Sequence, residues 1–162
     1  MNDGYAFPWY PICYGMDKDT PPVSECCELA ALVYSYDSRH TCSQECLLDG
    51  GKACCYDLCF LDTHKILTPN GINSEGLYNA FSYGKEMTSE MSEVLSNAMK
   101  LCLPLFNQGN GFTCNIPNGL FYVTKCIVRE TFKNCPNYTI SESCDELKRL
   151  LSACIEKTTP RP

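Results

Sequence analysis

Histidine is scarce in this 162-residue chain, and cysteine pairs with the C-x2-C spacing are absent. The only two histidines, His40 and His64, lie far apart in the sequence. A structural zinc site typically uses close C-x2-C pairs or paired histidine and cysteine ligands. The sequence therefore predicts no metal site, and no motif in it implies a cofactor.

Long apolar runs and clusters of basic residues are also missing. No apolar run approaches the ~18 residues that a membrane-spanning helix needs. The chain has 13 Lys and Arg against 19 Asp and Glu, a formal net charge of −6. Because nucleic acids and anionic membrane surfaces attract basic patches, we expect neither as a partner.

Catalytic motifs are absent as well, including G-x-S-x-G and H-E-x-x-H. The stretch 54–59 superficially resembles the C-C-x-x-H-D-x-C active-site helix of secreted phospholipase A2, in which the histidine is the general base. Here the residue directly before Asp57 is not a histidine, and the glycine-rich calcium loop of that family is missing. Since water is not activated without a base, we predict that the protein is not an enzyme.

Cysteine, by contrast, is abundant, with 14 residues. This number is even and far above ordinary usage, which indicates a disulfide framework formed in an oxidising compartment. We therefore expect a secreted, extracellular protein. Residues 1–4 lack the basic start and apolar core of a signal peptide, so we expect a mature form with an added start Met.

Cys55 and Cys59 form a C-x3-C pair around which the other predicted elements are arranged. On a helix this spacing places both sulfurs on one face, one turn apart and leaning the same way. Because they are poorly placed to bond each other, each is expected to reach a different segment. Cys54 can take a further partner, and Cys42 and Cys46 form a second C-x3-C pair.

Apolar periodicity predicts an all-α fold of six or seven helices, and no segment shows sustained strand alternation. The chain length suggests one domain. We expect a proline- and aromatic-rich extended arm over 1–22, one helical domain over 23–157, and a loose tail over 158–162. The expected helices cover about 22–34, a short segment around 42–46, 52–61, 74–83, 89–103, 118–133, and a final helix beginning with a capping box at 143–146.

The order and spacing of six cysteines are similar to the framework of arthropod odorant-binding proteins. The spacing is Cys27-x27-Cys55-x3-Cys59-x42-Cys102, followed by Cys126-x8-Cys135. The long gap from Cys102 to Cys126, the Cys135-Pro136 step and Cys144-x9-Cys154 resemble the Plus-C subgroup. The resemblance covers about residues 26–154. The pair at 42–46 departs from typical insect members and leaves open a divergent odorant-binding-like group from another arthropod lineage.

The resemblance implies that family's interlocked disulfides, which carry over as Cys27–Cys59, Cys55–Cys126 and Cys102–Cys135. The remaining cysteines would form four further bridges that tether the arm, the 42–46 turn, the 107–118 loop and the last helix. The sequence leaves their pairing open. These eight residues are Cys13, Cys26, Cys42, Cys46, Cys54, Cys114, Cys144 and Cys154.

The resemblance also implies a chemosensory transport function, in which a carrier reversibly binds small hydrophobic molecules such as odorants, semiochemicals or lipids. An internal cavity destabilises a fold by about 24 cal/mol per Å3 in core truncations. Disulfides offset this by about 2–4 kcal/mol each, on a model-dependent account. The candidate lining residues, whose helical spacing a solid core would explain equally well, are Leu77, Phe81, Met91, Leu95, Met99, Phe121 and Val123.

The alternative function is that of a disulfide-rich secreted interaction or inhibitor protein without a ligand cavity. A closed apolar cavity of more than a few hundred Å3 would favour the carrier, and a large exposed apolar patch would favour the alternative. Asn137-Tyr138-Thr139 is a sequon that predicts glycosylation of Asn137. Either histidine could sense pH, and a homodimer remains open.

Overall fold

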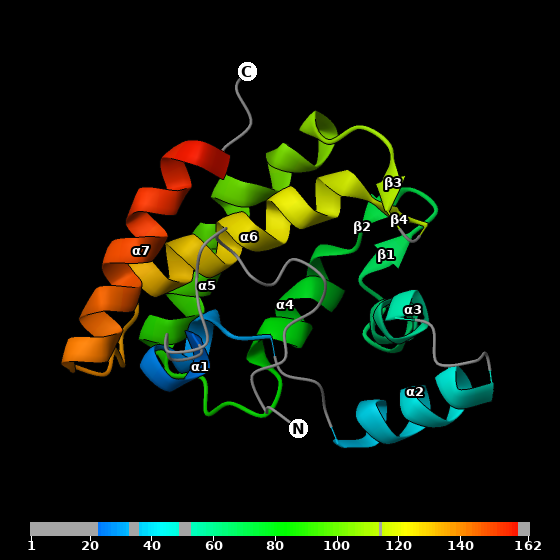
Figure 1. Cartoon of the computed structure of the whole chain (residues 1–162), viewed down its shortest axis with the longest axis horizontal. Helices are drawn as coiled ribbons and strands as arrows, with labels where there is room; N and C mark the ends of the chain where they lie inside the picture. Colours follow the sequence, from blue (N-terminus) through cyan, green and yellow to red (C-terminus); the bar gives the residue numbers. More distant parts are fainter. Residues whose placement is uncertain (1–22, 33–35, 49–52, 114, 159–162) are drawn as a thin grey trace.

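Seven α-helices and two 3-10 helices account for nearly all the secondary structure in the computed structural model (Figure 1), which describes residues 23–32, 36–48, 53–113 and 115–158. The predicted all-α fold is confirmed. The α-helices are α1 (Val23–Cys26), α2 (Tyr36–Leu48), α3 (Ala53–Thr63), α4 (Ser74–Ser82), α5 (Ser89–Cys102), α6 (Asn118–Lys133) and α7 (Glu142–Thr158), and the 3-10 helices are η1 (Glu28–Ala30) and η2 (Leu103–Gln108).

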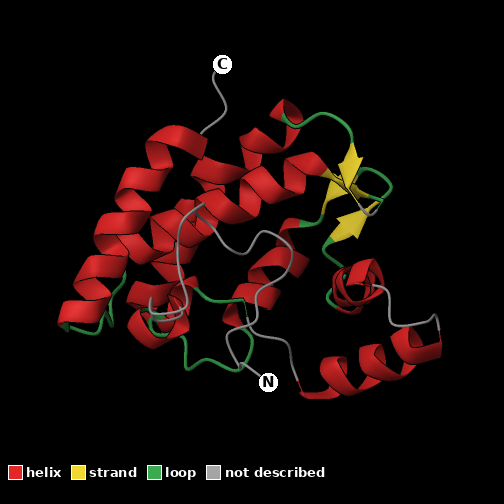
Figure 2. Cartoon of the chain, viewed as in Figure 1, coloured by secondary structure: helices red, strands yellow, loops and turns green. Residues whose placement is uncertain are grey.

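Two antiparallel ladders of two residues per strand tighten the loops (Figure 2). β1 (Leu67–Thr68) pairs with β2 (Gly71–Ile72), and β3 (Phe112–Thr113) pairs with β4 (Ile116–Pro117). The turn expected at Asn70-Gly71 is confirmed, with Gly71 at a φ of 123°, where a side chain would be strained. The strands are too short to form a sheet with a core of its own.

α5 and α6 form the central helix pair of the described core. α6 also contacts η1, η2 and α7, and α4 packs on α5 (Figure 1). Thr88 caps the start of α5, because its side-chain oxygen accepts a hydrogen bond from the Met91 N–H at 3.1 Å. Pro104 follows the end of α5, in η2. The spans predicted for α5 and α6 are confirmed.

The prediction of a single helix over 22–34 is wrong within the residues that the structure describes. α1 ends at Cys26, Cys27 has an extended backbone with a φ of −149°, and η1 follows. Successive side chains on a helix point only about 100° apart. The break at Cys27 instead lets the two neighbouring sulfurs reach different elements, since Cys26 bonds Cys144 and Cys27 bonds Cys135.

α2 and α7 also differ from the prediction at their first turns. α2 begins at Tyr36, well before the Cys42–Cys46 segment. α7 begins at Glu142, and its cap is Ser141, whose side-chain oxygen accepts from the Cys144 N–H at 3.1 Å. The capping box expected from Ser143 is therefore wrong by two residues. Ser141 precedes the helix, where a side-chain oxygen can meet an otherwise unpaired N–H.

Five disulfides join the described helices, and they contradict the pairing that the resemblance implied. None of Cys27–Cys59, Cys55–Cys126 and Cys102–Cys135 forms. Every cysteine whose side chain the structure describes is in one of the five bridges. The observed pairs are Cys26–Cys144, Cys27–Cys135, Cys42–Cys59, Cys46–Cys55 and Cys102–Cys126.

Both sulfurs of the C-x3-C pair on α3 bond to α2, so the expectation that they reach different segments is wrong. Cys59 bonds Cys42 and Cys55 bonds Cys46, in a nested arrangement. Cys42 and Cys46 on the neighbouring α2 have the same four-residue spacing, so they present two sulfurs at the same one-turn interval and both bonds form. α2 and α3 thus make a doubly cross-linked hairpin, at the end of the molecule away from α7 (Figure 1).

The bridge expected to tether the last helix is found, between Cys144 and Cys26 of α1. The 42–46 segment is bridged as expected, but its partners Cys59 and Cys55 lie outside the eight cysteines from which four further bridges were predicted. The arm over 1–22 and the tail after Thr158 lie outside the described residues, as do the side chains of Cys13, Cys54, Cys114 and Cys154.

Lys85 ties η1 to α4 through backbone carbonyl groups. Its Nζ donates to the carbonyl oxygens of Ala31 and Phe81, both at 2.6 Å, and of Leu29 at 3.5 Å. Burial lowers the pKa of Lys85 to about 8, and the Glu28 carboxylate acts in the opposite direction. The ammonium group thereby satisfies carbonyl groups that the ends of η1 and α4 leave without helical partners.

Proteolysis of the unreduced protein, followed by mass spectrometry, tests the disulfide arrangement. Cleavage after Glu45 separates Cys42 from Cys46 on α2. Cleavage after Tyr56 separates Cys55 from Cys59 on α3. We expect fragments in which Cys42 is joined to Cys59 and Cys102 to Cys126. A fragment that joins Cys55 to Cys126 would contradict the structure.

Replacing Lys85 by Met should lower the free energy of unfolding by about 1–3 kcal/mol, because buried carbonyl groups lose their donor. The matched control is Lys100→Met on the exposed surface of α5, for which we expect a change within about 0.5 kcal/mol. Urea unfolding followed by circular dichroism at neutral pH measures both. Equal effects of the two substitutions would show that the carbonyl contacts of Lys85 do not stabilise the fold.

Candidate functional site

The side chains predicted to line a cavity converge on one apolar core, and the cavity itself remains a prediction. Six of the seven are buried, and they come from α4, α5 and α6. The seventh, Phe121, is half-buried and packs against the core from its edge. The six buried residues are Leu77, Phe81, Met91, Leu95, Met99 and Val123.

Helical spacing explains how these residues come to share one core. Leu77 and Phe81 are four residues apart on α4, and the three residues from α5 repeat at the same interval. Positions four apart lie on one face of a helix, so each helix turns a single apolar stripe inward. Packing of α4 and α6 against α5 then joins the stripes.

Apart from the Asn137 amide, whose Nδ2 donates to the Met91 sulfur at 3.7 Å, the described core offers no polar group to a ligand. Its buried polar side chains are Thr124 and Thr131, and both hydroxyl groups bond within α6. Thr124 donates to the Leu120 carbonyl oxygen at 2.9 Å, and Thr131 donates to that of Ile127 at 2.7 Å. Only an apolar molecule would therefore fit among these side chains without losing hydrogen bonds to water.

Three fully buried core residues escaped the sequence prediction, namely Phe60, Ile66 and Ile116. Phe60 lies in α3, where the sequence signal was the cysteine spacing and not apolar periodicity. Ile66 lies in a loop and Ile116 in the two-residue strand β4, and both lack helical periodicity, so only their apolar character marked them.

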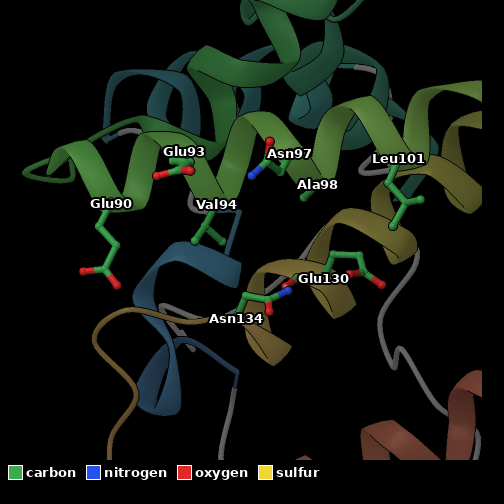
Figure 3. Close-up of a pocket in the computed structure, with 8 residues that line it drawn as sticks. All are labelled: Glu90, Glu93, Val94, Asn97, Ala98, Leu101, Glu130 and Asn134. Carbon is green, nitrogen blue, oxygen red and sulfur yellow. The ribbon is translucent and has the colours of Figure 1, made fainter.

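A surface groove of about 390 Å3 lies between α5 and α6 (Figure 3). It contains none of the predicted lining residues. The sequence signal that could have located it is the acidic pair Glu90 and Glu93, beside the apolar stripe of α5. The lining residues are Glu90, Glu93, Val94, Asn97, Ala98, Leu101, Glu130 and Asn134.

His64 lies in an aromatic contact between α3 and the end of α4. Its ring is 4.6 Å from the Phe60 ring and 5.9 Å from the Tyr83 ring, measured between centroids. Its Nε2 is buried and has no hydrogen-bond partner within the described segments. Burial lowers the pKa of His64 below 6.5. His40, on α2, is exposed.

Asn137 is exposed on the turn between α6 and α7. The turn is anchored by the Cys27–Cys135 disulfide and by the Thr139 N–H, which donates to the Cys26 carbonyl oxygen at 2.9 Å. The Tyr138 hydroxyl also donates to Asp145 at 2.7 Å. The predicted glycosylation site thus lies on the surface, and its modification remains a prediction.

Within the described segments, no group of three or more His, Cys, Asp or Glu residues is arranged to hold a metal ion. None of their helices is both long and apolar enough to cross a membrane. In comparisons with known proteins, the chain matches no family model, no curated protein and no solved structure.

Acidification should lower the free energy of unfolding through His64. In the unfolded chain the imidazole binds a proton below about pH 6.5, whereas in the fold its lowered pKa keeps it neutral. Stability should therefore fall as the pH drops from 6.5 towards the folded pKa. Urea unfolding at a series of pH values should show a shallower dependence for His64→Phe than for the unchanged protein.

His40→Phe is the matched control for this effect, because His40 lies on the exposed surface of α2. The pH dependence should fall more for His64→Phe than for His40→Phe. If both variants lose it equally, or His64→Phe keeps it, the buried Nε2 is not the source.

Proposed function

We propose that the protein is an extracellular carrier that reversibly binds small hydrophobic molecules between α4, α5 and α6. The observation that carries this proposal is the convergence of six predicted lining side chains from three helices on one apolar core. Two of the six, Met91 and Met99, are flexible and polarisable, which suits a core that adapts to ligands of different shape.

Disulfides around this core support the proposal, because they would hold the helices while the side chains make room for a ligand. Cys102–Cys126 joins the end of α5 to the middle of α6. Cys27–Cys135 joins the residue after α1 to the second residue after α6. A bound ligand restores the dispersion contacts that an empty cavity would lose.

The spacing of the cysteines resembles that of odorant-binding proteins and also supports a carrier, whereas their pairing does not. The pairing that the resemblance implied is not the one observed. Disulfide-linked helices around an apolar interior remain common to the proposal and to that family's architecture. The proposal therefore depends on the core residues rather than on the order of the bridges.

The α2–α3 hairpin favours a second candidate, a secreted interaction protein. Two disulfides make it rigid, and among the described elements α2 packs mainly on α3. Leu47 is 70% exposed and Leu58 is 37% exposed. Exposed apolar side chains on a rigid hairpin would suit contact with another protein.

Titration of the oxidised protein with a neutral, polarity-sensitive naphthalene dye tests the carrier. A ligand of ~15–20 heavy atoms at ~0.4 kcal/mol per atom should bind with a Kd between about 1 and tens of micromolar. Val123→Phe adds volume to the core and should weaken dye binding by about tenfold or more. Leu95→Ala removes volume and should strengthen it, while destabilising the fold by about 2–5 kcal/mol.

Leu47→Ala is the control for these variants, because it removes the same atoms as Leu95→Ala from an exposed position. It should leave dye binding unchanged. The absence of saturable binding to the oxidised protein, or loss of binding in Leu47→Ala alone, would favour the interaction protein. Circular dichroism should confirm that each variant is folded.

A further inference from the structure

The groove between α5 and α6 lies beside the core to which the proposed function assigns the hydrophobic ligand, and Ala98 belongs to both (Figure 3). It shares no residue with the predicted lining of that core. Its volume of about 390 Å3 falls in the range of about 300 to 1,000 Å3 that is typical of small-molecule sites. The groove is therefore large enough for a small ligand of its own.

The groove combines an apolar surface with carboxylate groups on both helices. Val94, Ala98 and Leu101 supply the apolar part from one side of α5, and Leu101 is 59% exposed. Glu90 and Glu93 supply carboxylates from α5. A ligand lying here would meet apolar contacts and negative charge at the same time.

α6 supplies the third carboxylate, from Glu130, and an amide, from Asn134 (Figure 3). The Asn134 Nδ2 donates to the Glu130 carbonyl oxygen at 2.9 Å. This bond uses one of the two N–H groups of the amide and leaves its oxygen to accept. The Glu130 carboxylate and the Asn134 amide oxygen are therefore acceptors for a ligand that donates hydrogen bonds, beside the second amide N–H.

No basic residue lines the groove, and within the described part of the chain none of its three carboxylates is in an ion pair. The negative charge of these carboxylates would attract a cation to the groove. The formal net charge of −6 also attracts cations to the molecule as a whole.

A metal ion does not fit this arrangement, because no described group of three acidic side chains is close enough together to hold one. The charges instead border an elongated apolar surface. We propose that the groove binds small organic cations, namely protonated primary amines that carry an apolar body. The ammonium group would lie against the Glu93 or Glu130 carboxylate and the body would cover Val94, Ala98 and Leu101.

Titration with 2-phenylethylammonium, followed by amide NMR shifts of the labelled full chain, tests this site. A ligand of this size should bind with a Kd near the millimolar range. We expect saturable shifts on α5 and α6 beside the groove. Binding should weaken when the ionic strength rises from about 0.01 M to about 0.15 M, since the Debye length falls from about 30 Å to about 8 Å.

Uncharged 2-phenylethanol has nearly the same shape and should bind at least about fivefold more weakly, since it lacks the ionic contact. Glu93→Gln and Glu130→Gln should each weaken amine binding by about two- to fivefold, as expected for partly exposed charge pairs. The matched control is Glu86→Gln, an exposed carboxylate outside the groove, which should leave amine binding unchanged.

Equal binding of the amine and the alcohol, shifts that lie away from α5 and α6, or equal effects of Glu86→Gln and Glu93→Gln would each overturn this assignment. Its failure is distinguishable from failure of the carrier proposal. Glu93→Gln should leave binding of the neutral dye unchanged, and Val123→Phe should leave binding of the amine unchanged.

Discussion

The disulfides that meet around α6 are the constraint on which the described core depends. Cys102–Cys126 fixes the middle of α6 to the end of α5. Cys27–Cys135 fixes the segment after α6 to the segment after α1. Cys26–Cys144 then brings α7 to α1. These bonds join segments more than a hundred residues apart in two of the three cases, so they restrict the unfolded chain strongly.

The cross-links divide the described structure into two regions with different potential uses. One is the core between α4, α5, α6 and α7, where apolar side chains are buried. The other is the α2–α3 hairpin, which two short-range disulfides cross-link and which contributes Phe60 and Leu61 of α3 to that core. A carrier would use the first region and an interaction protein would use the second. The two functions are therefore separable by substitution, since Leu95 and Leu47 lie in different regions.

α5 serves two environments because its residues face in different directions around the helix. Met91 and Leu95 are buried in the core, whereas Glu90, Glu93 and Asn97 are exposed along the groove. Residues one or two positions apart on a helix lie on different sides of it. An apolar ligand in the core and a cationic ligand in the groove would consequently lie against different faces of one helix, and binding of one would not require the other.

The sequence by itself determined the helical class, the spans of α5 and α6, and the apolar stripes that meet in the core, because caps and 3.6-residue periodicity act over a few residues. Only the tertiary structure decided which sulfurs pair, why the first helix breaks at Cys27, and that a groove lies between Glu93 and Glu130. Each of these depends on the distance between elements far apart in the chain. A disulfide needs two Cα atoms within about 7 Å, and residue spacing along one helix does not specify which other helix comes that close.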